Sequence, residues 1–380
     1  MPEHFHPDVF VEEINVPREI VAAPTAIAAF VGFAPRGPIN RPTKVTSVAD
    51  YEAAFGEIST DQPLSASVED FFLNGGSRAV IVRASADGRR GRADALIGSP
   101  KTKTGVHALA HGEDRVGLLI VPDAAYLPEK DVALVMTTAA SLAEAQGIFH
   151  IADVPNVVAS KGHDAALRWS KTIVRSRNMA IYHPWVSGPK KAAKVRPPSG
   201  IAAGIYARTD LAHGVWSAPA GQDATAMGVT SLAHTVSQAD AETLRSAGIN
   251  AIRKTAGGGV VLWGAGTFAN NDSEWRYVNI RRFFLFLKRS IEEGLSWVVF
   301  EPNGETLWAE IRLEISAFLH TAWRAGALQG TTPKDAYFVR CDASTMTQDD
   351  ITNGRINVVI GCAPLKPAEF VMLRFGFRAA

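Results

Sequence analysis

The chain has 380 residues, of which 47% are hydrophobic, so it is long enough to bury the cores of two domains. Its 39 lysine and arginine residues balance 38 aspartate and glutamate residues, which argues against nucleic acid or an anionic membrane as the main partner. No apolar run approaches the roughly 18 residues of a membrane span, and the start, MPEHFHPDVF, does not resemble a signal peptide. We therefore expect synthesis in the cytoplasm and no membrane insertion.

The first predicted element is a short strand in an N-terminal arm, residues 1–20. It consists of Val9, Phe10, Val11, Glu12, Glu13 and Ile14, a β-prone run between two prolines. Such a strand can close the sheet of its own domain, or it can add to a sheet edge on a neighbouring molecule. Because consecutive elements usually pair locally, the pattern by itself favours the first possibility.

Residues 21–248 are predicted to form an outer α/β domain. Apolar runs and helix-spaced residues indicate strand, helix, helix and strand at 26–33, 48–55, 64–73 and 79–82. Strands and helices then alternate from 117 to 206, which is typical of a largely parallel sheet covered by helices. Residues 87–114 are rich in Gly, Arg, Lys, Thr and Ser, and they are predicted to form an exposed excursion.

A second, inner domain is predicted at 249–363, with strands at 252–253 and 260–263 followed by two long helices. The first helix, 272–294, carries an apolar stripe and a separate basic strip. The second is predicted to be capped by Asn303. Four charged residues of this helix lie away from its apolar stripe, at positions where side chains usually face water: Glu305, Arg312, Glu314 and Arg324.

The sequence predicts a strand, a short helix and a second strand at the end of this domain. The first strand is Tyr337, Phe338, Val339 and Arg340, and the second includes Ile356, Val358, Val359 and Ile360. Between them Thr347 and Asp350 have capping-box spacing, and Gly354 is placed to end the helix.

The last segment, 364–380, is predicted to be a C-terminal arm, because Pro364 and Pro367 force an extended connector. A strongly apolar strand follows, and it must find a sheet: Glu369, Phe370, Val371, Met372, Leu373, Arg374 and Phe375.

No motif supports catalysis, cofactor binding or a metal site. The glycines that flank 260–263 lack dinucleotide-loop spacing, and no GK[ST] loop or G-x-S-x-G elbow occurs. His107 and His111 lack the glutamate of a zincin helix. Cys341 and Cys362 have neither metal nor nucleophile context and are expected to be core residues; a disulfide between them is not implied. We therefore expect no enzymatic activity.

Segments along nearly the whole chain resemble contractile tail sheath proteins of phages and of related extracellular injection particles. The resemblance is carried, in chain order, by PDVFVEEI, TAIAAFVGFAPRGPINRPTKVTSVADYEAAFG, FFLNGGSRAVIVRA, RPPSGIAAGIYARTD, GVWSAPAG, WRYVNIRRFFLFLKRSIEEGLSWVVFEPN and TMTQDDITNGRINVVIGCAPLKPAEFVMLRF.

The resemblance implies a structural subunit that stacks with other sheath copies as six-fold rings in a helical tube. Its further partners would be an inner tube protein and baseplate and tail terminator proteins. The arms of neighbours would complete a sheet in a third copy, with 9–14 and 369–375 as donated strands. The recipient sheet would contain 337–340 and 356–360.

The resemblance also implies that the polar side of a long helix, with Glu305, Arg312, Glu314 and Arg324, faces the tube. It raises the possibility of subunit contacts at 196–199 and 208–210; without the resemblance, the basic linker at 190–198 reads as a solvated loop. A phage tail and a DNA-free injection particle remain equally open. The rival predictions are an oligomeric α/β enzyme and another structural tail component.

Overall fold

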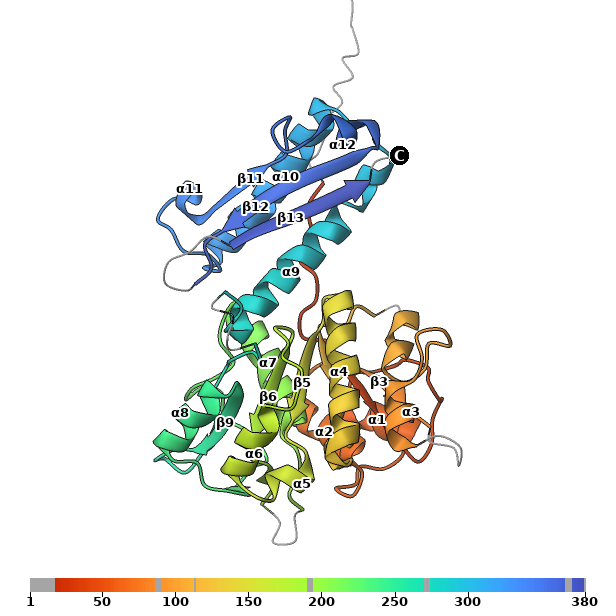
Figure 1. Ribbon diagram of the computed structural model, residues 1–380, viewed down its shortest axis with the longest axis vertical. Helices are drawn as coiled ribbons and strands as arrows, with labels where there is room; N and C mark the ends of the chain where they lie inside the picture. Colours follow the sequence, from red (N-terminus) through yellow and green to blue (C-terminus); the bar gives the residue numbers. More distant parts are fainter. Residues whose placement is uncertain are drawn as a thin grey trace, which may run out of the picture. The chain divides into compact units, whose positions relative to one another are not determined.

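The computed structural model describes residues 18–85, 91–112, 114–189, 194–269, 272, 274–365 and 371–378 (Figure 1). The chain divides into two compact units. We call Ala22–Arg289 the body, and we call Met1–Val21 together with Ser290–Ala380 the terminal unit, because it contains both ends of the chain. The predicted N-terminal strand, 9–14, lies outside the described residues, as do Glu369 and Phe370 of the predicted C-terminal strand.

The body is built on an eight-stranded sheet with strand order β10-β9-β6-β5-β4-β1-β3-β2. Strands from β9 to β3 in this order run parallel, and the edge strands β10 and β2 are antiparallel to their neighbours. The strands are β1 (Ala28–Gly32), β2 (Thr43–Val45), β3 (Ala79–Arg83), β4 (Leu118–Ile120), β5 (Phe149–Asp153), β6 (Met179–His183), β9 (Ile249–Lys254) and β10 (Val260–Leu262). A small separate sheet pairs β7 (Val186–Ser187) with β8 (Ser231–Leu232).

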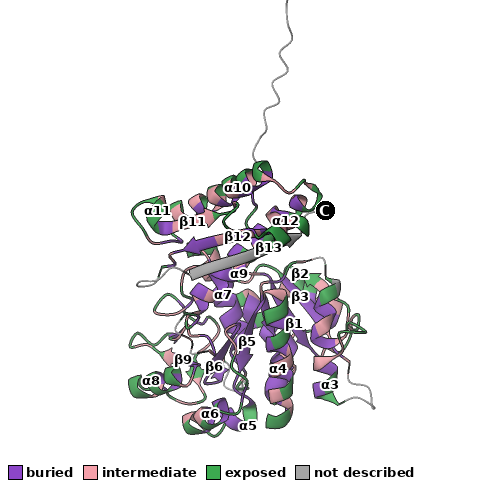
Figure 2. Ribbon diagram, turned by 45° about the horizontal axis from the view of Figure 1, so that its top comes forward, coloured by how far each residue is buried: buried purple, intermediate pink, exposed green. Residues whose placement is uncertain are grey.

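Helices cover both faces of this sheet, because alternate residues of each buried strand point to opposite sides. Ala29 and Val31 face one core, while Ala28 and Phe30 face the other. The first core is closed by α3 (Arg92–Ile97), α4 (Glu129–Gln146), α5 (Asn156–Ala159), α6 (His163–Ser170), α8 (Gln238–Ser246) and the 3-10 turns η1 (Gly105–His111) and η2 (Pro122–Tyr126). The second is closed by α1 (Val48–Phe55), α2 (Pro63–Leu73), α7 (Ser199–His213) and the start of α9 (Val278–Gly294). Figure 2 shows the central strands buried and exposure concentrated on the outer helices.

The terminal unit contains a three-stranded antiparallel sheet, β11-β12-β13. Its elements are η3 (Ser296–Phe300), α10 (Glu305–Arg324), α11 (Pro333–Ala336), β11 (Tyr337–Arg340), α12 (Gln348–Thr352), β12 (Arg355–Cys362) and β13 (Val371–Arg378). The predicted capping box is present, because the Thr347 hydroxyl accepts from Asp350 N and the Asp350 carboxylate accepts from Thr347 N. Gly354 follows with φ of +64°, a conformation that favours glycine. The predicted mixed α/β fold is confirmed.

Two predictions about the body were wrong. The segment 87–114 is not an exposed excursion, since Leu96, Val106 and Ala108 are fully buried against the sheet; the described part of this polar stretch packs through a few well-spaced apolar residues. Residues 86–90 and 113 lie outside the described part. A domain boundary near 249 is also wrong, because β9 pairs with β6 and extends the body sheet. The division falls after Arg289, inside α9.

The two long helices exist, but their starts differ from the predicted ones. The first begins at Val278 rather than at Asp272, and the second is preceded by Gly304 at the N-cap. Asn303 instead accepts a hydrogen bond of 2.7 Å from Trp308 Nε1. The side-chain oxygen of Asn303 is therefore occupied by the indole N–H and does not cap the helix.

The register of the terminal sheet excludes a disulfide between the two cysteines. Cys362 lies opposite Tyr337, whereas Cys341 follows Arg340 at the other end of β11. At about 3.4 Å per residue, four positions separate the thiols by roughly 13 Å, far beyond the reach of an S–S bond. Both are buried free thiols, as predicted for core residues, and burial raises the pKa of each to about 12.

Asp153, at the end of β5, makes the stability of the body depend on pH. Its carboxylate is buried and accepts a 2.9 Å hydrogen bond from Ser199 N, yet burial raises its pKa from 3.8 to about 7. The folded state therefore holds this proton more tightly than the unfolded state does. The stability that it contributes is complete below pH 3.8 and is lost as the pH rises through 7.

We expect Asp153→Asn to remove this loss of stability at high pH. Asparagine keeps an oxygen that can accept from Ser199 N, and its side chain does not ionise. Urea unfolding at pH 4 and at pH 8 should show the variant gaining on the wild type by up to about 4 kcal/mol at the higher pH. An equal difference at both pH values would show that folding does not raise the pKa of the Asp153 carboxyl.

Candidate assembly site

The edges of the terminal sheet are the first candidate site. β11 and β13 each pair with β12 on one side only, among the strands that the structure describes. An edge strand presents unpaired N–H and C=O groups that can take up a strand from another molecule. The predicted recipient residues are brought together here, since Val339 lies opposite Ile360 and Arg340 lies opposite Val359.

In this single chain β13 lies antiparallel beside β12, from Val371 opposite Cys362 to Arg378 opposite Arg355. It contains the described part of the predicted C-terminal donor, 371–375. The connector, residues 366–370, lies outside the described residues.

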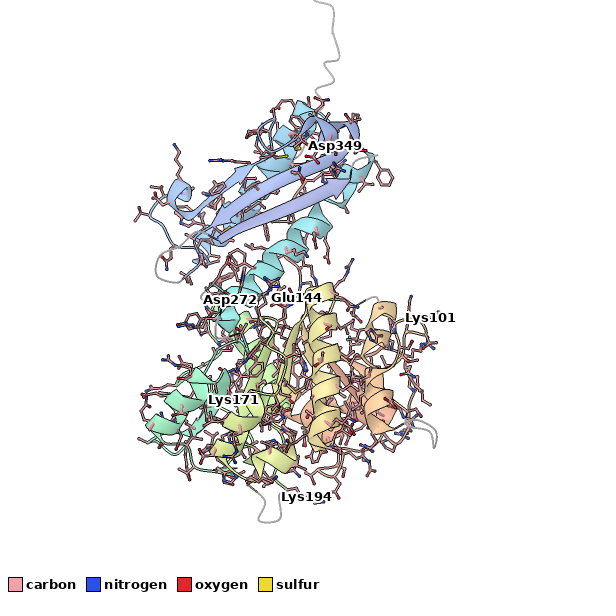
Figure 3. All side chains as sticks on the ribbon, viewed as in Figure 1. Lys101, Glu144, Lys171, Lys194, Asp272 and Asp349 are labelled. Atoms are coloured by element: carbon pink, nitrogen blue, oxygen red, sulfur yellow. The ribbon has the colours of Figure 1, made fainter. Side chains whose placement is uncertain are left out.

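The recipient strand β12 is held firmly from both faces. Ile356, Val358 and Ile360 are fully buried. The Arg355 guanidinium forms ion pairs with Asp349 and Asp350 of α12, and Asp350 also accepts from Thr347 Oγ1 at 2.6 Å. These bonds, the Thr347 hydroxyl first, lower the pKa of the Asp350 carboxyl. Figure 3 shows Asp349 on the outside of this unit. The strand is therefore a preformed template.

The residues predicted to face a tube do not form one charged surface. Glu314 is 7% exposed and accepts a 3.3 Å hydrogen bond from Trp297 Nε1. Burial raises the pKa of its carboxyl. Arg312 donates to the Cys341 carbonyl and, at 3.0 Å, to Glu305 Oε1. Glu314 is therefore excluded from a tube-facing surface, and Glu305 and Arg324 are the exposed members of the set.

The basic strip predicted on α9 is not a solvated face either. Arg281 donates to Asn178 Oδ1 at 2.5 Å, and Arg289 donates to the carbonyls of Val116 at 2.7 Å and Gln146 at 3.2 Å. These bonds hold the helix in the body through one side-chain amide oxygen and two main-chain carbonyls. Lys288 is the exposed residue of the strip.

A buried cluster that we call the α9 clamp, Arg282, Asp210 and Thr25, is the second candidate site. Arg282 forms a bidentate pair with Asp210 at 2.8 and 2.6 Å, and it also donates to the Thr25 carbonyl at 3.1 Å. The Thr25 hydroxyl donates to the same carboxylate at 2.6 Å. The two charged side chains are only 3% and 5% exposed. The guanidinium stacks 4.9 Å from the centre of the Tyr206 ring.

The clamp is significant because of where the chain passes between the two units. It crosses once after Val21 and once after Arg289. Thr25 follows the first crossing closely, and Arg282 precedes the second in the same helix. One buried ion pair therefore holds both covalent connections on the body side. Surface pairs such as Lys194–Asp61, 65% and 63% exposed, contribute little by comparison; Lys194 lies at the periphery of the body in Figure 3.

Two segments that the resemblance placed at possible subunit contacts contain residues that form ion pairs inside the body instead. Arg196 forms a bidentate pair with Asp70 at 2.6 and 2.7 Å, and both side chains are largely buried. Burial raises the pKa of the Asp70 carboxyl, and Arg196 opposes that change. Asp210 belongs to the clamp. Asp70 stands beside Glu69 and Arg282 beside Arg281, so the local sequence gives no signal that separates the buried charge from its neighbour.

No group of three or more His, Cys, Asp or Glu side chains in the described part of the chain could hold a metal ion. None of its helices is both long and apolar enough to cross a bilayer. His107 lies on η1, and burial lowers its pKa.

Comparison with known proteins identifies the class. Residues 97–268 match the central domain of phage tail sheath proteins, and residues 270–378 match the phage tail sheath C-terminal domain. The chain belongs to the phage tail sheath family, and its class is that of structural sheath subunits of contractile tails.

Its relatives come from prophages, phages and injection particles. The chain is 27% identical to a putative prophage major tail sheath protein of Pseudomonas aeruginosa (strain UCBPP-PA14), over 87% of this chain and 84% of that protein. It is 28% identical to the tail sheath protein of Enterobacteria phage T4, but over 47% of this chain and only 26% of that protein. A Vibrio phage KVP40 tail sheath protein is likewise matched over 26% of its length.

Solved sheath structures match over almost the whole chain. The contracted helical sheath of the anti-feeding prophage has 31% identity and a TM-score of 0.76, covering 98% of this chain and 99% of that chain. The sheath complex of the extracellular contractile injection system PVC, also contracted, has 28% identity and a TM-score of 0.77, covering 99% and 98%.

We expect Asp210→Ala to destabilise the body by about 3–5 kcal/mol, because it leaves the Arg282 guanidinium buried without its partner. Replacing both residues, Asp210→Leu with Arg282→Met, should recover most of this loss, since no charge then remains to be solvated. Denaturant unfolding of the three proteins measures the difference. A loss below about 1 kcal/mol for the single variant would show that the pair is not the constraint described.

Proposed function

We propose that this chain polymerises with copies of itself, in six-fold rings stacked helically around an inner tube protein, and that contraction of the polymer drives the tube through a target envelope. The observation that carries this proposal is the terminal sheet, whose third strand lies beyond a proline-bearing connector at the end of a sheath-family chain. Baseplate and tail terminator proteins would bound the polymer.

Strand exchange would join the copies. A strand that pairs through main-chain hydrogen bonds forms the same ladder in its own chain and in a neighbour, so exchange costs little beyond the connector geometry. The donors would be 9–14 and 369–375, and β11 with β12 would form the recipient sheet. Joints of this kind would keep their hydrogen bonds while the connectors change angle. Rings can then rotate without separating.

Contraction would release a metastable extended lattice into one with more contact between bodies. No nucleotide is needed, because a gain of even a few kcal/mol for each subunit is multiplied along the polymer. The protein would be made in the cytoplasm of a host cell and assembled into a phage tail or a DNA-free injection particle. The inferred role is structural, without catalysis or nucleic-acid binding.

Truncation after Pro364 tests the exchange. The shortened chain should remain folded, because the body does not include the removed strand, but it should not form polymers in electron micrographs. Leu373→Asp should have the same effect in the full-length chain, since a charge in the ladder disfavours pairing. The control is Leu134→Asp, a substitution of an exposed leucine on α4 of the body. Normal sheaths from the truncated chain would refute the donor role.

A further inference from the structure

Three histidines from separate segments of the body gather at the carboxyl end of β6. His183 is the last residue of β6, His163 begins α6, and His234 lies between β8 and α8. The ring centres of His163 and His183 are 5.2 Å apart, and the His234 ring lies 5.9 Å from the first and 6.4 Å from the second. His183 is fully buried, whereas the other two are partly exposed. We call these three side chains the histidine cluster.

The hydrogen bonds of the cluster fix where its protons lie at neutral pH. His163 Nε2 lies 2.9 Å from the Thr235 carbonyl, which can only accept, so this nitrogen carries a proton. The neutral ring then has a bare Nδ1, which accepts from His183 Nε2 at 3.1 Å. His183 Nδ1 is therefore bare, and it is buried without a hydrogen-bond partner among the described residues. One neutral arrangement thus satisfies both bonds.

A proton added in acid does not fit this arrangement. At His163 Nδ1 it would set two N–H donors against each other, and moving the His183 proton to its Nδ1 would leave a buried donor unpaired. At His183 it would place a charge on a buried ring. Burial, followed by the neighbouring His163 and His234, lowers the pKa of His183 to about 3. By either route, acid weakens the bond between His163 and His183.

The other titratable groups around the cluster do not remove this conflict. They are Lys161 and Asp164 beside His163, Asp240 of α8, Arg253 of β9, and Tyr182 of β6, which faces the opposite core. β7 and β8 contain no charged residue. The Asp240 carboxylate accepts from Ser237 N and Oγ, and these bonds, more than His163, lower its pKa. Asp240 therefore favours a charged His163, while its own hydrogen bonds are already made to Ser237.

The segment that the cluster holds, residues 230–236, has few other anchors. It pairs with β7 through the two residues of β8, Ala233 N donates to the Trp185 carbonyl at 2.8 Å, and Arg253 donates to the Val236 carbonyl at 3.3 Å. Val236 is the one residue of this segment that is buried. Segments with so few buried apolar contacts open locally at low cost in free energy. We propose that the histidine cluster is an acid-sensitive latch, which holds residues 230–236 against the end of β6 at neutral pH and releases them in acid.

The latch acts in the opposite direction to Asp153. Acidification strengthens the body through the Asp153 carboxyl, whose pKa burial raises to about 7, so a loss of protection confined to residues 230–236 cannot come from that group. The latch also lies wholly within the body. It is therefore tested on the unassembled chain, and its failure would leave the proposed polymer and strand exchange untouched.

Amide hydrogen exchange of the full-length chain at pH 8 and pH 5, corrected for the intrinsic effect of pH, measures the latch. The amides of Thr230 and Ala233 donate to the Ser187 and Trp185 carbonyls. Their protection should fall at least about tenfold at pH 5, because like charges then oppose one another in the cluster, while α4 keeps its protection.

The key variant is His163→Gln, whose amide can donate to the Thr235 carbonyl and accept from His183 without ionising. It should melt at the wild-type temperature at pH 8 and show no fall in protection at pH 5. The matched control is His213→Gln, at an exposed histidine at the end of α7, and it should show the wild-type fall.

Equal protection of residues 230–236 at the two pH values in the wild type would overturn the proposal. So would a fall of wild-type size in His163→Gln. If that variant does not fold, His234→Gln takes its place, since it leaves both hydrogen bonds of His163 intact and removes one charge from the cluster. Its fall should be smaller than that of the wild type, and an undiminished fall would overturn the latch.

Discussion

The bidentate pair between Arg282 and Asp210 is the constraint on which the arrangement depends. A charge taken out of water is tolerated only when its hydrogen-bonding capacity is met, and here the carboxylate accepts from the guanidinium and from the Thr25 hydroxyl. The pair therefore fixes the segment that enters the body and the helix that leaves it. Any load that reaches the body from the terminal unit along the chain passes through these two connections. The clamp therefore anchors both connections on the body side.

The terminal unit differs from the body in the size of its sheet and in the exposure of its sheet edges. Its sheet is small, its third strand is tethered by a connector, and its edges remain able to pair with further strands. A short sheet of this kind gains stability from each strand that is added. The body, by contrast, has a complete core of its own. This division matches the demands on a polymer whose joints must persist while its lattice changes.

Local signals in the sequence predicted the elements that depend on local physics. The Thr347–Asp350 capping box and the buried strands of the body follow from residues close together in the chain, and the structure has both. Non-local pairings were not predictable in this way. β9 joins the body because it pairs with β6, and Arg282 is buried because Asp210, 72 residues away, lies beside it. Glu314 is covered by Trp297 from a separate turn, which no helical pattern reveals. The family was evident from segments spread along the chain, and the comparisons confirm it.

The central claim is that β13 pairs with β12 of another copy in the polymer. Val371 lies opposite Cys362 in this ladder, so Val371→Cys, in a Cys341→Ala background, places two thiols across the pairing. Mild oxidation of assembled polymers, followed by denaturing electrophoresis without reductant, reports which chains are joined. The account predicts a ladder of covalent multimers from the polymer. A single band of internally linked monomer would contradict it, since each chain would then keep its own last strand.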